Sequence, residues 1–249
     1  MKAFQVKRNT ASHLSSFLNA ALFFFIIILG PTHALGAPYD YGDAPDPTYP
    51  TLSSSNGARH SVSRDYYLGT ALDPDPDGQP NADATGDNLD GGFDEDGVTF
   101  TTPLYPGMTC YITVTASLDG LLDAWIDFNS DGDWADPFEQ IFTSITLLSG
   151  DNTLSFTVPA DAERGATTFA RFRYSLQGDL QPTGEAAVGE VEDYAVRIEN
   201  EAKDFGDTPA DIYPTQLVDD GARHTVPSGY SLGASIDADP DGQSNSTAT

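Results

Sequence analysis

The sequence predicts an all-β fold, an antiparallel β-sandwich with long acidic loops. Two observations lead to this prediction. Beyond residue 37, short runs alternate apolar and polar residues, and Gly, Pro, Asn and Asp turns separate these runs. In the same region no stretch has an apolar stripe at helical spacing. Several short strands joined by turns are typical of two packed antiparallel sheets.

Residues 1–37 have the layout of a secretory signal. Three basic residues lie among the first eight, the apolar run from Leu18 to Leu29 follows, and small residues extend to Ala37. The run has about 12 residues, fewer than the roughly 20 that a membrane-spanning helix needs. We therefore expect a signal helix that is removed, and a secreted mature chain at the cell surface or outside the cell, without membrane insertion. An uncleaved N-terminal anchor is the alternative.

Charge and cysteine content exclude several classes of protein. All 38 acidic residues follow Ala37, whereas only eight of the 11 basic residues do. So negative a chain is a poor partner for nucleic acid or anionic lipid. The single cysteine, Cys110, forms no intramolecular disulfide, so packing or metal must hold the exported fold. Its alternation with Ile112 and Val114 indicates a buried strand thiol and not a nucleophile.

The predicted strands lie in the middle of the chain, and alternate side chains mark their inner faces. The residues expected to face inward are Cys110, Ile112, Val114, Leu122, Ala124, Ile126, Phe128, Leu154, Phe156, Val158, Ala170, Phe172, Tyr174, Tyr194, Val196 and Ile198. Trp125 is out of phase with Ile126 and is expected to face solvent or a partner, with core packing as the alternative. Residues 38–100 are rich in Pro, Gly and Asp and are expected to be loops with little structure unless something ties them down.

An internal repeat divides the chain. The segment from Asp40 to Asn81 returns from Asp204 to Asn245 at a constant, gapless offset of 164 residues, for example as DYGDAP and then DFGDTP. So long a period indicates tandem domains and not a solenoid. We therefore expect a signal at 1–37, a first sandwich repeat with an acidic N-terminal loop region at 38–200, and the truncated start of a second repeat at 201–249. The chain is then a fragment of a longer array.

The stretch IDFNSDGDW, which begins at Ile126, carries the first candidate metal ligands. Asp127, Asn129, Asp131 and Asp133 are spaced two apart, and Gly132 precedes the last of them. This resembles the first half of the EF-hand loop, in which alternate side chains converge on calcium and glycine makes the turn. No helices flank it, and Phe138 stands where the closing acid is expected. Two nearby acids, Asp136 and Glu139, are candidates for that closing role.

A second acidic motif, DPDPDG, places Asp73, Asp75 and Asp77 at the same spacing, and its counterpart in the second repeat keeps all three acids. Nine acids and no Lys or Arg lie from Asp73 to Asp96. Two carboxylates ~4 Å apart repel by about 4 kcal/mol at an effective dielectric constant of ~20, so a compact loop needs a cation. Calcium suits oxygen ligands, whereas zinc prefers His and Cys clusters. A solvated acidic surface or a disordered acidic linker is the alternative.

One further motif carries a family resemblance. The run GEVEDY from Gly189 to Tyr194, together with WIDFNSDGDW and the DYGDAP opening, resembles the GEVED domain of secreted bacterial surface proteins. The resemblance implies a β-sandwich module repeated in large exported proteins, and no defined activity. Glu190, Glu192 and Asp193 begin or precede the last strand, and could close the metal site. The alternative is that Glu190 or Glu192 pairs with Arg171 or Arg173.

The motif GARH occurs from Gly57 to His60 and again from Gly221 to His224, and it is the motif whose residue types most resemble those of a catalytic site. A histidine beside an arginine is a possible general base, yet no Ser or Cys nucleophile lies in a recognisable context. We expect instead that Arg59 pins the acidic loops and that His60 caps a turn.

The sequence therefore predicts a non-enzymatic extracellular repeat module of an adhesin-type surface protein, stiffened by structural Ca2+. Its expected partners are neighbouring repeats of the same chain, and surface glycans or matrix proteins. One alternative is a carbohydrate-binding module that uses Trp125, Trp134, Tyr105 and Tyr111 as exposed aromatic residues. A secreted hydrolase is a more remote alternative.

Overall fold

The computed structural model describes residues 39–70, 72, 74–86, 95–200, 203–226, 239, 241–244 and 246. The predicted signal at 1–37 and the candidate ligand Asp73 lie outside the described residues.

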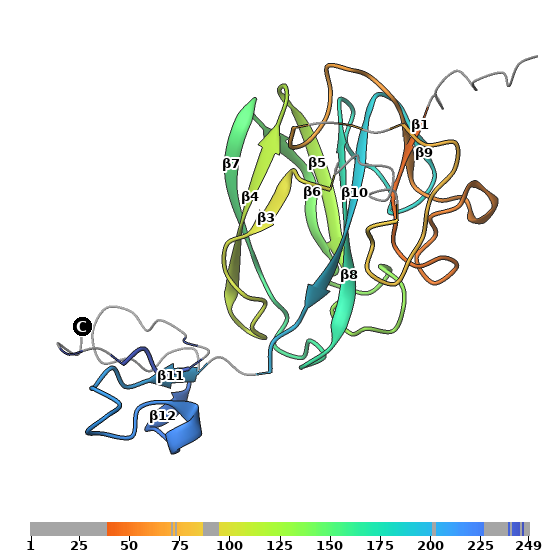
Figure 1. The fold of residues 1–249 in the computed structure, drawn as a ribbon. Helices are drawn as coiled ribbons and strands as arrows, with labels where there is room; N and C mark the ends of the chain where they lie inside the picture. Colours follow the sequence, from red (N-terminus) through yellow and green to blue (C-terminus); the bar gives the residue numbers. More distant parts are fainter. Residues whose placement is uncertain are drawn as a thin grey trace, which may run out of the picture. The chain divides into compact units, whose positions relative to one another are not determined.

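Residues 95–200 form a sandwich of two antiparallel sheets (Figure 1). The larger sheet has the order β10-β8-β5-β6, with β10 at Gly189–Arg197, β8 at Thr167–Ser175, β5 at Gly120–Ile126 and β6 at Gln140–Leu147. The smaller sheet has the order β3-β4-β7, with β3 at Val98–Phe100, β4 at Thr109–Ala116 and β7 at Gly150–Thr157. The described residues contain no α-helix. The predicted all-β sandwich is therefore confirmed.

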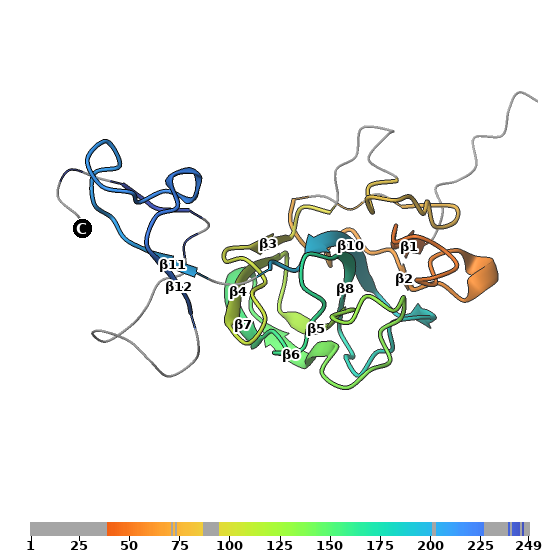
Figure 2. The same cartoon turned by 90° about the horizontal axis from the view of Figure 1, so that it is seen from below.

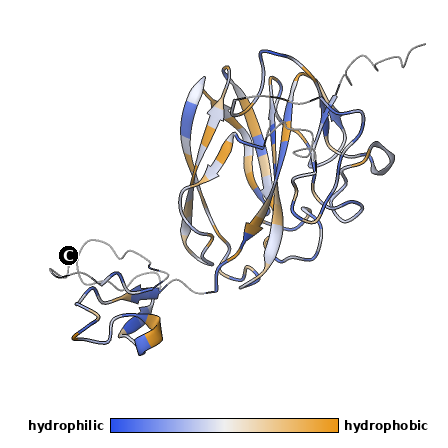
Figure 3. Cartoon of the chain, in the orientation of Figure 1, coloured by the Kyte–Doolittle hydropathy of each residue, from blue (hydrophilic) through white to orange (hydrophobic). Residues whose placement is uncertain are grey.

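The hydrophobic core lies between the two sheets, and the predicted inner faces form it. Every residue expected to face inward belongs to one hydrophobic cluster, with Leu154 and Tyr194 at its partly buried margin. Alternation of hydrophobic and hydrophilic residues along the strands is visible in Figure 3. Cys110 is fully buried on β4, and its thiol donates a hydrogen bond to the Thr102 carbonyl at 3.3 Å. Burial raises the pKa of this thiol, which agrees with the predicted buried strand cysteine.

A third layer covers the outer face of the larger sheet. Residues 39–86, called here the covering segment, contain β1 (Tyr39–Tyr41), β2 (Arg59–Ser61) and the short 3-10 turn η1 (Ser53–Ser55). β1 pairs with β2, and β2 pairs in parallel with β9 (Glu185–Ala186). Figure 2 shows β1 and β2 beside β8 and β10, on the side away from β4 and β7. The covering segment has little regular structure, as expected, but it is anchored to the sheet.

This layer buries side chains that simple alternation places in solvent. The outer face carries Arg171, Arg173, Asp193, Asp123 and Trp125, and none of them is more than 3% exposed. The expectation that Trp125 faces solvent is therefore wrong in part, because its partner is the chain's own covering segment. Trp125 packs in a small cluster with Ala44, Tyr49 and Trp134. Trp134 and Tyr105 are also buried, whereas Tyr111 is exposed.

The stretch 203–226 repeats the element order of the covering segment. It contains β11 (Lys203–Phe205), β12 (Arg223–Thr225) and the 3-10 turn η3 (Leu217–Asp219). β11 and β12 pair as an antiparallel two-stranded sheet. These elements lie within the expected start of the second repeat at 201–249.

Candidate functional site

The IDFNSDGDW stretch forms the connection between β5 and β6. The backbone turns sharply there, because Ser130 and Gly132 both have left-handed φ angles, of 57° and 98°. Such angles suit glycine and cost other residues energy. Side chains stabilise the turns: the Asn129 Oδ1 accepts a hydrogen bond from the Asp131 amide at 3.1 Å, and the Asp133 Oδ1 accepts one from the Ala135 amide at 2.8 Å. The DxNxDGD pattern is therefore first of all a set of local turn signals.

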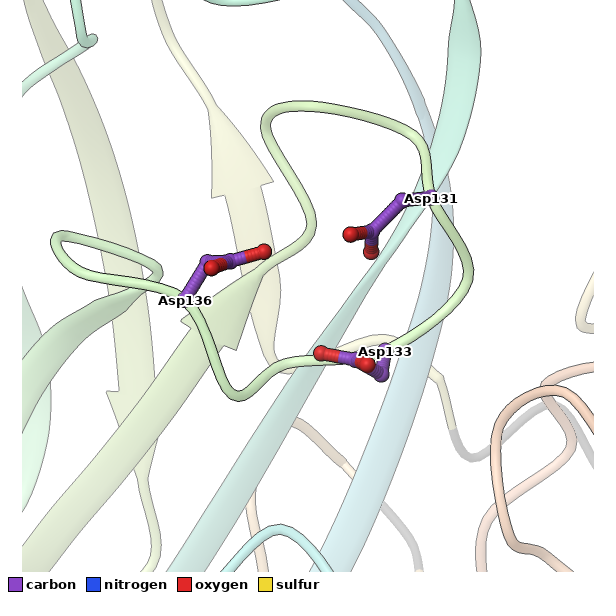
Figure 4. A group of neighbouring side chains, drawn as sticks. All are labelled: Asp131, Asp133 and Asp136. Atoms are coloured by element: carbon purple, nitrogen blue, oxygen red, sulfur yellow. The ribbon is translucent and has the colours of Figure 1, made fainter.

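Three carboxylates converge above this turn. Asp131, Asp133 and Asp136 each place one oxygen within 4.8 Å of the others, and all three residues are exposed. Figure 4 shows their carboxylates pointing toward a common space inside the loop. In the part of the chain that the structure describes, this is the only such group of His, Cys, Asp or Glu residues. Three oxygen ligands on one irregular loop suit a hard cation such as calcium.

The amide of Asn129 lies between two of these acids. Its Nδ2 donates hydrogen bonds to Asp131 Oδ2 at 3.1 Å and to Asp136 Oδ2 at 2.8 Å. The amide thereby offsets part of the repulsion between the two carboxylates. A neutral amide supplies no full positive charge, so it does not neutralise the three carboxylates.

Two further predicted ligands lie beneath the loop and hold its backbone. Asp127 is fully buried, and its Oδ2 accepts hydrogen bonds from the Tyr49 hydroxyl at 2.6 Å and from the Gly132 amide at 3.0 Å. Its Oδ1 is buried without a hydrogen-bond partner. The Glu139 carboxylate accepts from the Phe128 amide at 3.2 Å and the Asp136 amide at 3.1 Å. Both acids lie outside the group of three.

Glu139 shows what this crowding does to a carboxyl group. Burial, followed by the nearby charges of Asp127, Asp136 and Asp131, raises the pKa of Glu139 to about 7, although a hydrogen bond from the Asp136 amide opposes the shift. A bound cation would favour the ionised form and reverse part of this shift.

The DPDPDG acids serve the covering segment. The Asp75 Oδ1 accepts a hydrogen bond from Gln79 Nε2 at 2.7 Å. The Asp77 carboxylate accepts bonds from the Ser53 amide at 2.6 Å and the Ser53 hydroxyl at 3.0 Å. The structure does not bring Asp75 or Asp77 into the Asp131 group.

The three acids of the GEVEDY run fasten separate pieces of chain to β10. Glu192 accepts hydrogen bonds from the Asp96 amide at 3.1 Å and the Gly97 amide at 2.8 Å. Glu190 accepts one from the Leu68 amide. Asp193 accepts bonds from the Asp43 and Ala44 amides, both at 2.8 Å. Each of the three therefore contacts a different part of the chain that precedes the sandwich strands.

Asp193 also forms a buried ion pair with Arg171, its neighbour across the strand pair. Arg171 Nε and Nη2 donate to the two carboxylate oxygens, each at 2.7 Å, and both side chains are fully buried. The same guanidinium donates to the carbonyls of Pro50 and Pro182 at 2.7 and 2.8 Å and lies 4.7 Å from the ring centre of Trp134. The acid that pairs with Arg171 is therefore Asp193, through two parallel bonds, and not Glu190 or Glu192, which the sequence offers as its partners.

Arg173 and His60 form the second half of this buried network. Arg173 Nε donates to His60 Nε2 at 3.1 Å, while His60 Nδ1 lies 2.9 Å from the Ala187 carbonyl oxygen. These partners place the histidine proton on Nδ1 and keep the ring neutral. Burial, and then the Arg173 charge, lower the pKa of His60 well below its usual value. His60 therefore supports the covering segment, and Arg59 pairs with Glu185 at 3.0 Å, outside the acidic run from Asp73 to Asp96.

Residues 121–197 match the family model of the GEVED domain. This chain carries a GEVED domain. The match runs from β5 to β10 and includes the acidic loop, the arginine strand β8 and the GEVEDY acids. The covering segment, whose backbone amides bind Glu190 and Asp193, lies outside the match. No curated protein and no solved structure matches the chain. The described part of the chain has no helix of the length and hydrophobicity that a membrane span requires.

The sequence predicted the acidic loop but not the arginine network on the larger sheet, β10-β8-β5-β6, called here the GEVED sheet. One available signal was the R-x-R spacing of Arg171 and Arg173 on a strand whose other face is apolar. Another was the return of GARH in both repeats. Neither signal identifies all of its partners, because some of them, such as Thr51 for Arg171 and His60 for Arg173, lie more than a hundred positions away in the sequence.

Proposed function

We propose that the GEVED domain of this chain, with its covering segment, is a non-enzymatic structural module of an exported surface protein, and that Ca2+ stiffens its acidic loop. The observation that carries the calcium proposal is the convergence of Asp131, Asp133 and Asp136. One carboxylate oxygen of each of these exposed residues lies within 4.8 Å of the others. Such an arrangement gains free energy from a divalent cation.

The proposed ligand set differs from the full list of sequence candidates. Asp131, Asp133 and Asp136 are the proposed direct ligands, and the oxygen of Asn129 is available if its amide rotates when the cation binds. Asp127 and Glu139 position the loop backbone from below. Glu190 and Asp193 hold the covering segment through backbone amides, and Asp193 also binds Arg171. Glu192 binds the amides of Asp96 and Gly97.

A structural role agrees with how the potentially reactive groups are used. His60 is buried and engaged by Arg173 and the Ala187 carbonyl. Cys110 is buried on β4, with its pKa raised. A general base or nucleophile has to reach a substrate, and these two groups face the interior. Adhesin-type function, with neighbouring repeats and surface glycans or matrix proteins as partners, is part of this proposal.

The calcium proposal has a defined energetic consequence. With a Kd of ~0.1 mM, in the range of extracellular modules, ~2 mM calcium adds roughly 1.8 kcal/mol to the stability of the domain. For a domain of this size that corresponds to an increase in Tm of about 4–7 °C. The test is thermal unfolding of the full chain in EDTA and in calcium, followed by circular dichroism.

Matched variants locate the effect. Asp131→Asn and Asp136→Asn are expected to abolish the calcium-dependent rise in Tm. Asp65→Asn removes the same charge from an exposed site in the covering segment and is expected to leave the rise intact. An unchanged wild-type midpoint on addition of calcium contradicts the calcium proposal, as does an equal loss of response in Asp65→Asn.

A cavity beside the loop favours a second candidate function, carbohydrate binding. Its volume is about 540 Å3, and its lining combines Asp133, Asp136, Gln140, Gln181 and the two tryptophans. Both tryptophans are nearly fully buried, so sugar binding here would rest on polar groups and not on the stacking platforms expected from the sequence. Binding on a glycan array that is lost in Gln140→Ala and retained in Gln177→Ala would support this candidate.

A further inference from the structure

The two repeats share the same local fold, which permits a comparison within one chain. Tyr39, Asp40 and Tyr41 pair with Ser61, His60 and Arg59 in the first repeat. The residues 164 positions later, Lys203, Asp204 and Phe205, pair in the same register with Thr225, His224 and Arg223. The turns η1 and η3 also correspond, and each ends at a left-handed residue, Asn56 with φ 57° or Asp220 with φ 54°.

Side-chain hydrogen bonds within the two repeats correspond as well. The Thr51 hydroxyl donates to the Ala44 carbonyl at 2.8 Å, and the Thr215 hydroxyl donates to the Thr208 carbonyl at 2.8 Å. Asp77 accepts from the amide of Ser53, as Asp241 does from the amide of Leu217. The second repeat thus has the local structure of a covering segment.

Burial separates the residues of this structure into two sets. One set is buried in both repeats and supports the local fold, and its pairs are Tyr41 and Phe205, Thr51 and Thr215, Gly57 and Gly221, and Gly78 and Gly242. The other set is buried in the first repeat and exposed in the second. Its pairs, first-repeat residue first, are Gly42/Gly206, Ala44/Thr208, Tyr49/Tyr213, Ala58/Ala222 and His60/His224. Tyr49 is 5% exposed, whereas Tyr213 is 55% exposed.

The first-repeat members of the second set include the groups that bind the GEVED sheet. The Ala44 amide donates to Asp193, the Tyr49 hydroxyl to Asp127, and His60 Nε2 accepts from Arg173. Their counterparts in the second repeat therefore form a surface shaped for the same chemistry: a carboxylate flanked by two arginines on adjacent antiparallel strands.

A glycine gives independent support. A Cβ atom on Gly42 would overlap Asp193 Oδ2 and lie 2.8 Å from its Cγ, so the GEVED sheet requires glycine there. A Cβ atom on Gly206 would have no described heavy atom within 4 Å, and its φ lies outside the left-handed region. The local structure of residues 203–226 therefore gives no reason for glycine at 206. Glycine at 206 is explained if an aspartate of another sheet approaches it as Asp193 approaches Gly42.

We propose that residues 203–226 carry a docking surface for the outer face of a second GEVED sandwich. Its members are Gly206, Asp207, Thr208, Tyr213 and His224. The sandwich of residues 95–200 already binds the covering segment, so the occupant is another GEVED sheet with the same Arg-x-Arg strand beside a Glu-Asp strand. The sheet face carries Asp193 and Asp123 beside its arginine pair, so charge complementarity is local. In the first repeat Asp40 acts electrostatically on Arg173, and Asp204 is its counterpart among the five acidic and two basic residues of 203–226.

The test extends the full chain after Thr249 with a second copy of residues 86–200, which preserves the 164-residue register. Carbethoxylation by diethyl pyrocarbonate, followed by peptide mass spectrometry, reports the accessibility of each histidine. In the original chain His224 is expected to react and His60 to be protected. In the extended chain, modification of His224 is expected to slow by about tenfold or more, because docking must open before the ring is exposed.

Two glycine variants of the extended chain make the test specific. Gly206→Ala is expected to restore modification of His224 and leave His60 protected, whereas Gly42→Ala has the opposite pattern. Unchanged reactivity of His224, failure of the appended sandwich to fold, or protection that survives Gly206→Ala would overturn the proposal. The surface contains none of the acidic-loop residues, so protection is expected in EDTA as in calcium, and the docking and calcium proposals can fail separately.

Discussion

Replacement of Asp193 by asparagine is the sharpest perturbation of this fold. Asp193 accepts four hydrogen bonds: two from Arg171 and two from the amides of Asp43 and Ala44. Asparagine keeps the shape but removes the charge, and its NH2 group must face a donor. The Arg171 guanidinium, which is fully buried, then lacks its counter-charge.

The expected magnitude follows from that burial. Removing one partner of a buried, hydrogen-bonded ion pair costs about 3–5 kcal/mol, because the remaining charge is left uncompensated. In a domain of this size each 1 kcal/mol lowers Tm by about 2–4 °C, so Asp193→Asn is expected to lower Tm by roughly 10 °C. The exposed pair of Arg197 and Glu199, 3.8 Å apart, provides the control, and Glu199→Gln is expected to change stability by less than about 0.5 kcal/mol.

The assay is thermal and urea unfolding of the full chain, in calcium and in EDTA. The structural argument requires the same loss in both conditions, because Asp193 binds Arg171 and backbone amides. A double-mutant cycle with Arg171→Met and Asp193→Leu is expected to give a coupling energy of at least about 1 kcal/mol. A Tm within about 2 °C of wild type would refute the reasoning. A loss that disappears in EDTA would instead identify Asp193 as a metal ligand.

Three further outcomes are expected. Gly42→Ala lowers Tm by several degrees, since its Cβ would overlap Asp193, whereas Gly206→Ala leaves the Tm of the original chain unchanged. The difference in unfolding free energy between wild type and His60→Gln is expected to narrow as pH falls below about 6.5. The histidine of the unfolded chain takes up a proton in that range, whereas burial and Arg173 lower the pKa of the folded one. Wild type therefore loses stability as pH falls, and the variant does not. A constant difference from pH 7 to pH 5 in urea unfolding would contradict this assignment. Native Cys110 resists a disulfide reagent and reacts only on unfolding, because it is fully buried; rapid colour development with the native protein would show otherwise.

Local patterns were sufficient where the determining interactions are local. Alternation along Ala170, Phe172 and Tyr174 identified an inner face, because side chains in a strand point to opposite sides with a period of two. The DxNxDGD spacing identified the turn, because the residues that form it lie within ten positions of one another. It supplied Asp131 and Asp133 among the candidates, while Asp136 was a candidate for the closing acid. The edge strand β6 was harder to predict, since its pairing with β5 shifts register near Ala124.

Residues of the same type have different roles where segments distant in the sequence come into contact. Asp127 and Glu139 share the acidic pattern with Asp131, yet they lie beneath the loop, because residues 39–86 cover that side of the sheet and Tyr49 reaches Asp127. Trp125 has the alternation of an exposed residue and is buried by the same segment. Periodicity in one strand contains no information about which other segment will cover its outer face.

The sequence by itself determined five strands of the sandwich (β4, β5, β7, β8 and β10), their inner faces, the acidic turn and the 164-residue repeat, all of which depend on spacing along the chain. Only the tertiary structure decided which acids converge, which acids bind Arg171 and the backbone amides, and which face of the second repeat is exposed. The physical reason is that burial of the outer face depends on contacts between segments more than a hundred residues apart, such as Ala44 with Asp193. Such contacts form only when a polar covering layer closes over an arginine-bearing sheet.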